Sequence, residues 1–384
     1  VEVTAADGAR RLLRAARAVV VATGTRATVP PIPGLADAQP WDNRASTGAH
    51  TVPRRLVVLG GGAVGAELAQ AFRRLGSETV TVVEGGPRLL AREEEFAGDQ
   101  VKESFEADGI TVLLGTRVVE VRRAPGGVDQ PRPPVTVTLD RGAGSAGPGP
   151  GSGPGSGTHA DGPGSPGGEA GPGTFEADEI LVAVGRTPAT AELGLDALGL
   201  RAGGFIEVDE RLRAVGVAAG WLYAVGDVNG RALLTHMGKY QARIAADVIT
   251  GRRDSAGQDA RDLADGRAVP RVTFTDPQVS AVGLTERAAR EAGLSVRAVS
   301  VATGGVAGSS VRGEGATGTS KLVVDEQRRV LVGATFTGQD TQELVHAATI
   351  AIVGAVPLER LWHAVPSFPT VSEVWLRLLE EYGL

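Results

Sequence analysis

Residues 55–65 read RLVVLGGGAVG, and residues 66–84 continue as AELAQAFRRLGSETVTVVE. The apolar run at Arg55–Leu59 predicts a buried strand, and the apolar spacing of Ala66–Leu75 predicts a helix. Thr79–Val83 reads as a second buried strand. A strand, a glycine-rich turn, a helix and another strand make a βαβ unit, so this stretch predicts a Rossmann-type parallel sheet.

The turn fits the motif G-x-G-x-x-G, with its glycines at Gly60, Gly62 and Gly65. The first glycine permits a tight turn, the second lets the backbone approach a pyrophosphate, and the third lets the helix pack on the strand. The N-terminus of the helix offers free amide groups to the phosphate. Because the motif follows a strand and opens a helix, it predicts dinucleotide binding; the alternative is a plain glycine-rich turn.

Glu84 ends the second strand, 19 residues after Gly65. A carboxylate there can accept hydrogen bonds from both ribose hydroxyls, and it would repel a 2′-phosphate. The nucleotide is therefore expected to be NAD(H) rather than NADP(H). The alternative is an ordinary exposed glutamate.

The composition limits the class of protein. A length of 384 residues favours two or three domains, and a net charge of −6 without a basic stripe argues against a nucleic-acid partner. No apolar run is long enough to span a bilayer and no signal peptide opens the chain, so a cytoplasmic protein is expected. The chain opens on Val1 within what reads as a strand, and we expect it to begin inside a longer gene or domain.

The metal and thiol chemistry open to the chain is limited by its Cys and His content. There are no cysteines, so a disulfide, a thiolate nucleophile and a cysteine-ligated metal are excluded within this chain. The five histidines include no pair at metal-ligand spacing, and no metal site is expected.

Two later stretches interrupt the alternation of strands and helices. Val118–Arg123 and Val135–Leu139 read as arms of a hairpin or meander, and residues 142–173 are almost all Gly, Pro, Ser and Ala. Such a composition cannot bury enough apolar surface to offset its ordering entropy, so we expect a disordered insertion at a hairpin tip. Beyond the polar boundary Gly251–Arg267, short strands and helices predict an α+β module.

Three further strands end in a glycine, at Thr23-Gly24, at Val184-Gly185 and at Gly226-Asp227. Each pair alone is as well explained as a simple strand terminus. Asp227 could cap a turn, or it could hold a hydroxyl of a polyol at the carboxyl end of its strand.

Taken in order, these motifs resemble the pyridine nucleotide–disulfide oxidoreductase family, and most closely its dihydrolipoamide dehydrogenase branch. The motifs are ATG at 22–24, PIPG at 31–34, G-x-G-x-x-G with Glu67, VGRTP at 184–188, YAVGD at 223–227, and FTDP at 274–277 with VG at 282–283. The resemblance implies an α/β fold with two nested Rossmann-like dinucleotide-binding domains and a C-terminal α+β dimerisation domain. The implied boundaries are 1–50 with 187–266 for a partial FAD domain, 51–186 for the NAD domain and 267–384 for the dimerisation domain.

The resemblance also implies roles for single residues. In the NAD domain, Gly185 would lie near the nicotinamide half of NAD, and Glu67 would lie close to the flavin–nicotinamide stack; alternatively, Glu67 is only a polar helix residue. The implied FAD contacts are Thr23 and Gly24 beside the cofactor, Asp227 on its ribityl chain, and His236 under its ring system.

The chain departs from the family pattern in two places. The family begins with its own FAD-binding G-x-G-x-x-G and, in disulfide reductases, a redox-active cysteine pair, and this chain has neither. The C-terminal signature His-Pro-Thr-x-x-Glu reads here as FPTVSE at 368–373. Phe368 has no ionisable group and cannot replace the histidine acid/base. Thr370 and Glu373 have the spacing of a capping box, so Glu373 is expected to cap a helix, and no catalytic residue is assigned.

The expected function is that of an FAD-dependent NAD(P)H oxidoreductase, which passes hydride from NADH through flavin to a quinone-like or other small acceptor. One alternative is a dihydrolipoamide dehydrogenase-type disulfide oxidoreductase. Another is a truncated NAD-binding remnant without flavin catalysis. A homodimer is expected from the resemblance.

Overall fold

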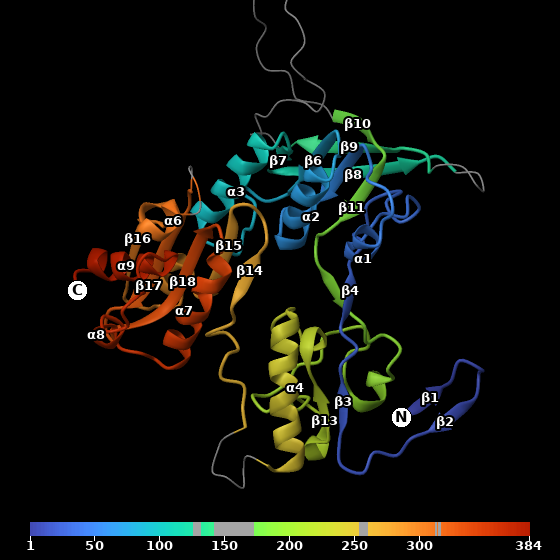
Figure 1. The fold of residues 1–384 in the computed structure, drawn as a ribbon. Coiled ribbons are helices and arrows are strands. Elements are labelled where there is room, and N and C mark those ends of the chain that lie inside the picture. The colour runs from blue at the N-terminus through green and yellow to red at the C-terminus, as the bar shows by residue number, and fades with distance from the viewer. Residues whose placement is uncertain (126–131, 142–172, 253–259, 312, 314–315) are drawn as a thin grey trace, which may run out of the picture. The chain divides into compact units, whose positions relative to one another are not determined.

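The computed structural model describes residues 1–125, 132–141, 173–252, 260–311, 313 and 316–384 (Figure 1). The chain divides into two compact units, and each is discontinuous in sequence. The first unit comprises Val1–Arg26 and Arg186–Val269, and the second comprises Ala27–Gly185 and Pro270–Leu384. Residues 27–50 thus fall in the second unit, although the resemblance implied that they belong with the FAD domain.

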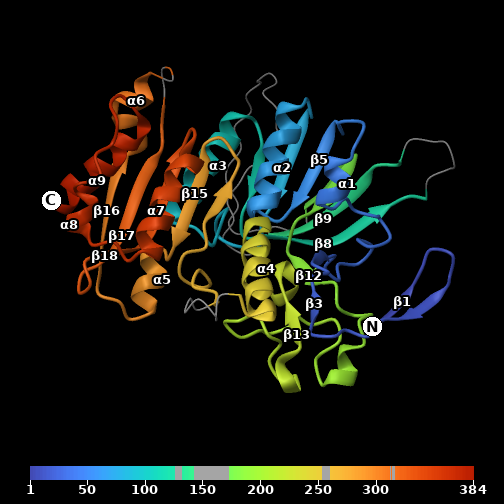
Figure 2. The ribbon, with the colours of Figure 1, turned by 60° about the horizontal axis from the view of Figure 1, so that its bottom comes forward.

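The second unit contains the predicted βαβ stretch. Its parallel sheet has the strand order β11-β5-β6-β7, built from β5 (Arg55–Leu59), β6 (Thr79–Val83), β7 (Thr111–Leu113) and β11 (Glu179–Val182). The helices between these strands are α2 (Ala63–Arg74), which lies against β5 and β6, and α3 (Glu95–Ala107) (Figure 2). The bounds of β5 and β6 match the prediction because their valines and leucines are buried, as in parallel strands covered on both faces.

A second, antiparallel sheet in this unit has the order β10-β9-β8. Its strands are β8 (Thr116–Arg123), β9 (Val135–Arg141) and β10 (Gly173–Ala177). The pairing of β8 with β9 confirms the predicted antiparallel arms. Of the expected insertion, residues 142–172 lie outside the described residues, so their disorder stays a prediction. Gly173 was wrongly included in that insertion, because it pairs with Leu139 as the first residue of β10.

Residues 270–384, here called the C-terminal module, are built on a five-stranded antiparallel sheet with the order β14-β15-β18-β17-β16. The strands are β14 (Arg271–Thr273), β15 (Gln278–Gly283), β16 (Val296–Ala302), β17 (Thr319–Asp325) and β18 (Val330–Gly338). The helices are α5 (Glu286–Glu291), α6 (Ala307–Ser310), α7 (Leu344–Val353), α8 (Leu358–Leu361) and α9 (Val374–Tyr382). This mixture of sheet and helices confirms the expected α+β module.

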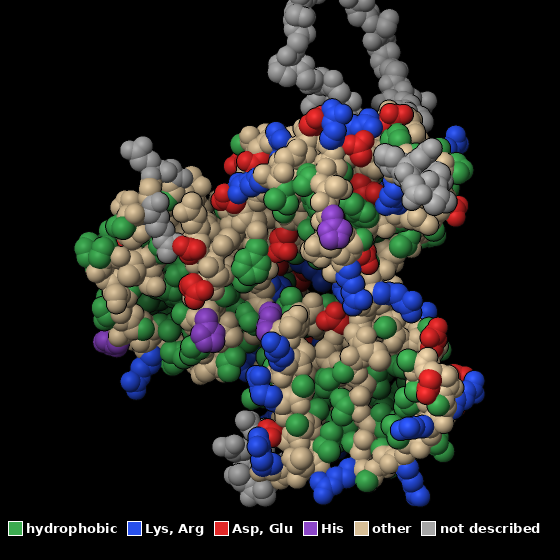
Figure 3. Space-filling model, turned by 45° about the vertical axis from the view of Figure 1, so that its right-hand side comes forward, with side chains coloured by type: hydrophobic (Ala, Val, Ile, Leu, Met, Phe, Trp, Pro, Cys, Tyr) green, Lys and Arg blue, Asp and Glu red, His purple; other side chains and the backbone are tan. Residues whose placement is uncertain are grey.

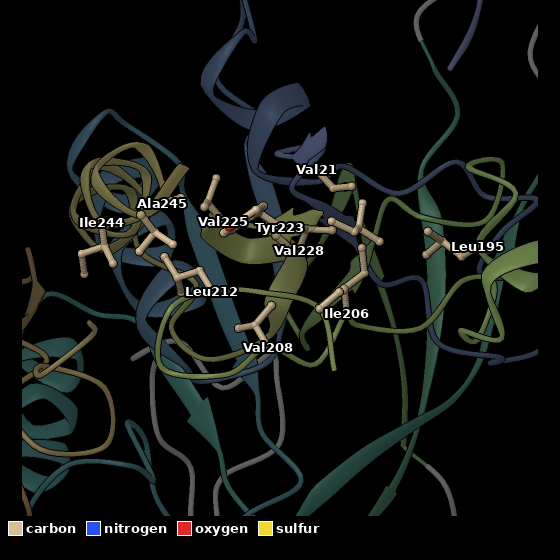
Figure 4. Packing of buried hydrophobic residues seen from close by; sticks show 14 of the residues in the cluster. Val21, Leu195, Ile206, Val208, Leu212, Tyr223, Val225, Val228, Ile244 and Ala245 are labelled. Atoms are coloured by element: carbon tan, nitrogen blue, oxygen red, sulfur yellow. The ribbon is translucent and has the colours of Figure 1, made fainter. Parts of the chain in front are cut away.

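The first unit is built around a parallel pair, β3 (Val19–Val21) and β13 (Leu222–Ala224), beside helix α4 (Thr235–Thr250). Figure 4 shows its core, a cluster of buried residues that includes Val21 and Tyr223 from the strands and Ile244 from α4. Its other strands are short: β1 (Glu2–Thr4) pairs with β2 (Arg10–Leu12), and β4 (Thr25–Ala27) pairs with β12 (Arg186–Pro188).

The described surface carries both signs of charge. Figure 3 shows basic and acidic side chains interspersed with apolar ones on the face in view, in keeping with a net charge of only −6. Within the described ranges, no helix combines the length and the apolar character that a bilayer crossing would need.

Candidate functional site

The glycine turn of the second unit can be built only from glycine at two of its positions. Gly60 has a φ of +107°, and a Cβ on it would lie 2.7 Å from the carbonyl oxygen of Ala183. A Cβ on Gly65 would lie 1.9 Å from the carbonyl oxygen of Gly60. At Gly62, by contrast, a Cβ would meet nothing within 4 Å. The outer two glycines are therefore needed for packing, whereas the middle one faces space that a ligand could enter.

The first turn of α2 leaves polar groups available at the same place. Gly62 is the N-cap of α2, and no side chain caps the helix there. Among the described residues, no hydrogen-bond acceptor is found for the amides of Ala63, Val64 or Gly65. Unpaired amides at the positive end of a helix dipole bind an anion such as a phosphate. An open approach at Gly62 and free amides beside it fit a dinucleotide pyrophosphate.

Glu84 lies beside this turn and is held there by the backbone. Its Oε2 accepts the Gly61 amide at 2.7 Å, and its Oε1 accepts the Gly86 amide at 2.6 Å. The residue is half-buried rather than an ordinary exposed glutamate. Because each carboxylate oxygen can accept more than one hydrogen bond, capacity remains for the hydroxyls of a ribose.

Gly185 is brought to the same edge of the parallel sheet. It follows β11, which pairs with β5, and a Cβ on Gly60 would lie 3.3 Å from the Val184 side chain. Gly185 has a φ of +146°, and its carbonyl accepts the Thr28 amide at 3.0 Å. The Val184–Gly185 strand end thus lies against the glycine turn, as parallel strands with a common carboxyl edge require.

Glu67 is more than a polar residue on an exposed helix face. Its Oε1 accepts the backbone amide of Phe274 at 2.8 Å. Burial raises the pKa of the Glu67 carboxyl, while the hydrogen bond from Phe274 acts in the opposite direction. Glu67 therefore links α2 to the loop between β14 and β15.

The expected flavin contacts lie in the first unit, where Thr23-Gly24 and Gly226-Asp227 follow the paired strands β3 and β13. The Asp227 side chain is 24% exposed, and its Oδ2 accepts the Thr25 hydroxyl at 2.8 Å. The Arg186 Nε lies 3.5 Å from the same oxygen. His236 is exposed in the first turn of α4. Sequence reasoning missed Thr25 and Arg186, although each directly follows a glycine that it had singled out.

These residues fit one part of an FAD molecule. The partly exposed Asp227 carboxylate at the carboxyl end of two parallel strands suits a polyol hydroxyl. The N-cap of α4 in the first unit is Leu234, so this helix does not begin at a glycine-rich turn like that of α2.

The C-terminal signature differs from expectation at Glu373. Its Oε1 accepts Arg377 Nη2 at 2.8 Å, and its buried Oε2 has no partner among the described residues. The Thr370 hydroxyl donates to the Ser367 carbonyl instead of capping the helix. The expected capping box is therefore wrong, because Arg377 one turn later holds the Glu373 carboxylate. Phe368 is 77% exposed.

Comparisons with known proteins agree with the motif order. Residues 3–245 match the family model for pyridine nucleotide-disulphide oxidoreductases, and residues 269–378 match the dimerisation domain of the same family. A dihydrolipoyl dehydrogenase of Chlorobaculum tepidum is 34% identical over 379 residues, which are 97% of this chain and 70% of that protein. A mercuric reductase of Staphylococcus aureus is 28% identical, over 93% of this chain and 57% of that protein.

Solved structures show the same fold. RclA, an HOCl-induced flavoprotein disulfide reductase of Escherichia coli, superimposes with a TM-score of 0.77 at 25% identity, over 99% of this chain and 75% of that one. LpdA of Mycobacterium tuberculosis gives a TM-score of 0.78 at 24% identity, over 100% of this chain and 73% of that one. These matches confirm the predicted fold class, as well as FAD and NAD(H) as the cofactors of the family. By motifs, family models and fold together, the chain belongs to the pyridine nucleotide–disulfide oxidoreductase family.

Proposed function

We propose that the chain works as an FAD-dependent oxidoreductase that takes its electrons from NADH and gives them to a small acceptor of the quinone class. The observation that carries the donor half is the combination of free amides at the start of α2, the open approach at Gly62 and the fixed carboxylate of Glu84. Bound FAD supplies the redox chemistry, because it can take a hydride from a nicotinamide and pass electrons on.

The chain's own groups would bind and orient the donor. The amides of Ala63–Gly65 would hold the pyrophosphate, and Glu84 would accept the ribose hydroxyls. Two like charges about 4 Å apart repel by about 4 kcal/mol at the effective dielectric near a protein surface. A 2′-phosphate beside Glu84 would meet that repulsion, so NADH should be preferred over NADPH. We assign Gly185 and Glu67 to the nicotinamide half of the same site.

The flavin contacts remain part of this proposal. Asp227 would hold a hydroxyl of the ribityl chain, with Thr25 and Arg186 orienting its carboxylate. Thr23, Gly24 and His236 would contact the same cofactor from the neighbouring strand end and helix. None of these groups has to transfer a proton for the donor half of the reaction.

The acceptor half rests on Phe368. Reduction or oxidation of a dithiol requires a group that handles the thiol proton, and a phenyl ring cannot do so. An acceptor that takes electrons without a positioned acid is therefore favoured over a disulfide. The competing candidate is dihydrolipoyl dehydrogenase activity, which the 34% identical relative from Chlorobaculum tepidum favours.

We further propose a homodimer formed through the C-terminal module, whose family model is that of a dimerisation domain. A cavity of about 200 Å³ in this module is lined in part by Leu361, Ala364, Pro366 and Trp375. Large apolar side chains are exposed on α7 and on the segment that follows α8, namely Ile350, Val353, Trp362, Val365 and Phe368. The partners would then be NADH, a small acceptor and a second copy of the chain, in the cytoplasm.

The acceptor assay tests the proposal. The full chain is incubated with FAD, freed of excess cofactor, and assayed with NADH and a soluble quinone, and separately with NAD⁺ and dihydrolipoamide. We expect retained flavin absorbance, quinone reduction and little oxidation of dihydrolipoamide. Strong turnover of dihydrolipoamide would reverse the ranking of the two activities. If the chain binds NADH but retains no flavin, the result would favour the alternative that the chain is an NAD-binding remnant without flavin catalysis.

A further inference from the structure

A loop of the C-terminal module is hydrogen-bonded to α2, the helix that begins at the glycine turn. The loop Phe274–Pro277 joins β14 to β15, and both polar backbone groups of Asp276 pair with the side-chain amide of Gln70 on α2. Gln70 Oε1 accepts the Asp276 amide at 2.7 Å, and Nε2 donates to the Asp276 carbonyl at 3.1 Å. Gln70 is only 4% exposed, so water does not readily replace these bonds.

The same contact reaches a third element. Gln70 Nε2 also donates to Asp108 Oδ2 at 3.0 Å, at the C-terminal end of α3. Arg74, one turn further along α2, donates to the carboxylates of Asp108 and Asp276 at 3.0 Å and 2.9 Å. One buried amide therefore joins α2, α3 and the C-terminal module.

The residues of α2 that face the loop form a single stripe. Glu67, Gln70 and Arg74 are spaced by three and four residues, which places them on one face of a helix. The loop thus holds α2 over about two turns. Gln70 lies five residues after Gly65, or roughly 7.5 Å along the helix axis. Because no side chain caps α2, the helix body must hold the amides of its first turn in place.

We propose that Gln70 is a positioning residue for the NADH site, which couples the affinity for NADH to the docking of the C-terminal module. It fixes the rotation and height of α2 against the loop Phe274–Pro277, and so it sets where the amides of Ala63–Gly65 meet the pyrophosphate. The proposal rests on the NADH site described above.

A pair of glutamine variants tests this role. Gln70→Met keeps the length of the side chain and leaves the Asp276 amide unpaired, while the Asp276 carbonyl keeps its hydrogen bond from the Ser104 hydroxyl. Gln100→Met is the matched control. Gln100 on α3 also joins the C-terminal module, through the Thr319 hydroxyl at 2.8 Å and that of Thr337, and among the described residues it has no hydrogen bond to α2. We expect the Kd for NADH, measured by fluorescence titration, to rise about tenfold in Gln70→Met, the effect of one buried polar group left unpaired. Gln100→Met should bind NADH like the wild type, even where both variants lower Tm alike.

A second variant covers the case in which Gln70→Met does not fold. In Gln70→Glu, a protonated carboxyl can still donate to the Asp276 carbonyl. The ionised form would face that carbonyl and the Asp108 carboxylate, with Arg74 the nearby cation. The ratio of its Kd to that of the wild type should therefore rise with pH, which loss of stability alone would not produce.

Three results would separate the possible failures. If the wild-type chain binds no NADH, both the proposed function and this inference are wrong. A wild type that binds NADH, with folded Gln70 variants of equal affinity at every pH, would overturn the inference alone. Equal losses of affinity in Gln70→Met and Gln100→Met would assign the effect to module docking in general, and not to Gln70.

Discussion

At the scale of single residues, Glu84 decides which nucleotide is preferred. Its carboxylate is fixed by the amides of Gly61 and Gly86, so the charge stays beside the turn. Removal of hydrogen bonds to a charged group weakens binding by about 1.5–3 kcal/mol, or roughly tenfold to a hundredfold. We expect Glu84→Ala to lose NADH affinity by such a factor and to bind NADPH comparatively better. Kd values for both nucleotides measure this, and an unchanged ratio between them would contradict the assignment.

Gly62 and Gly65 form a matched pair for separating binding from folding. A Cβ at Gly62 meets no atom within 4 Å, and its φ of −76° suits any residue. Gly62→Ala should therefore keep the thermal stability of the wild type and lose NADH affinity. Gly65→Ala would place a Cβ 1.9 Å from the Gly60 carbonyl oxygen, so it should lower Tm strongly. Thermal melts and NADH titrations on both variants check the pair; equal NADH affinity in Gly62→Ala and the wild type would argue against a pyrophosphate at this position.

Glu67 makes stability depend on pH. Burial raises the pKa of its carboxyl, so the folded chain holds this proton more tightly than the unfolded chain does. The resulting stabilisation is complete below the ordinary value of 4.5 and is lost as pH rises through the folded value. The wild type should therefore lose unfolding free energy as pH rises from about 4.5 to about 7.5, whereas Glu67→Gln should not lose this contribution. The unfolding free energy of Glu67→Gln minus that of the wild type should increase over this range. Urea denaturation at both pH values measures this; a difference that does not change with pH would count against the buried carboxyl.

The sequence could predict the turn glycines and Glu84, because each role follows from position relative to a strand and a helix. It could not predict that Gln70 pairs with Asp276, which lies 206 residues away. The predicted partner of the Glu373 carboxylate was also wrong, because the same sequence is compatible with a capping box and with a hydrogen bond from Arg377. Local pattern identifies groups that act through the backbone, whereas side-chain partners distant in the chain depend on the folded arrangement.

At the scale of elements, β9 and β10 are joined by 31 residues, 142–172, although Leu139 and Gly173 are directly paired. The entropic free-energy cost of closing a loop falls by about 0.6 kcal/mol each time the loop length is halved. Replacement of 142–172 by a four-residue turn should thus raise the unfolding free energy by up to about 2 kcal/mol, with unchanged NADH affinity. Urea denaturation of the shortened chain tests this; a fall in stability would mean that the removed segment contributes contacts to the fold.

Strands were predicted correctly where a continuous apolar run in the sequence indicates a buried strand. The strands β5 and β6 were predicted with their bounds because they are continuous apolar runs. By contrast, β15 was missed, since Pro277 directly precedes it and only its place between β14 and β18 explains its burial. The strand β10 was missed because it begins at the end of a glycine- and proline-rich stretch.

At the scale of the whole molecule, the proposed dimer rests on the exposed apolar residues of the C-terminal module. Val365 is 85% exposed there, and Leu12 on β2 of the first unit is nearly as exposed at 83%. A charge buried in an interface is strongly unfavourable, whereas a charge on an exposed surface has little effect. We therefore expect Val365→Asp to shift the chain towards a monomer, and Leu12→Asp to leave the dimer intact. Light scattering after size-exclusion chromatography gives the mass of each.

If Val365→Asp stays dimeric and Leu12→Asp does not, contacts of the first unit hold the two copies together instead. If the wild type itself is a monomer, the exposed apolar side chains of the C-terminal module require another explanation.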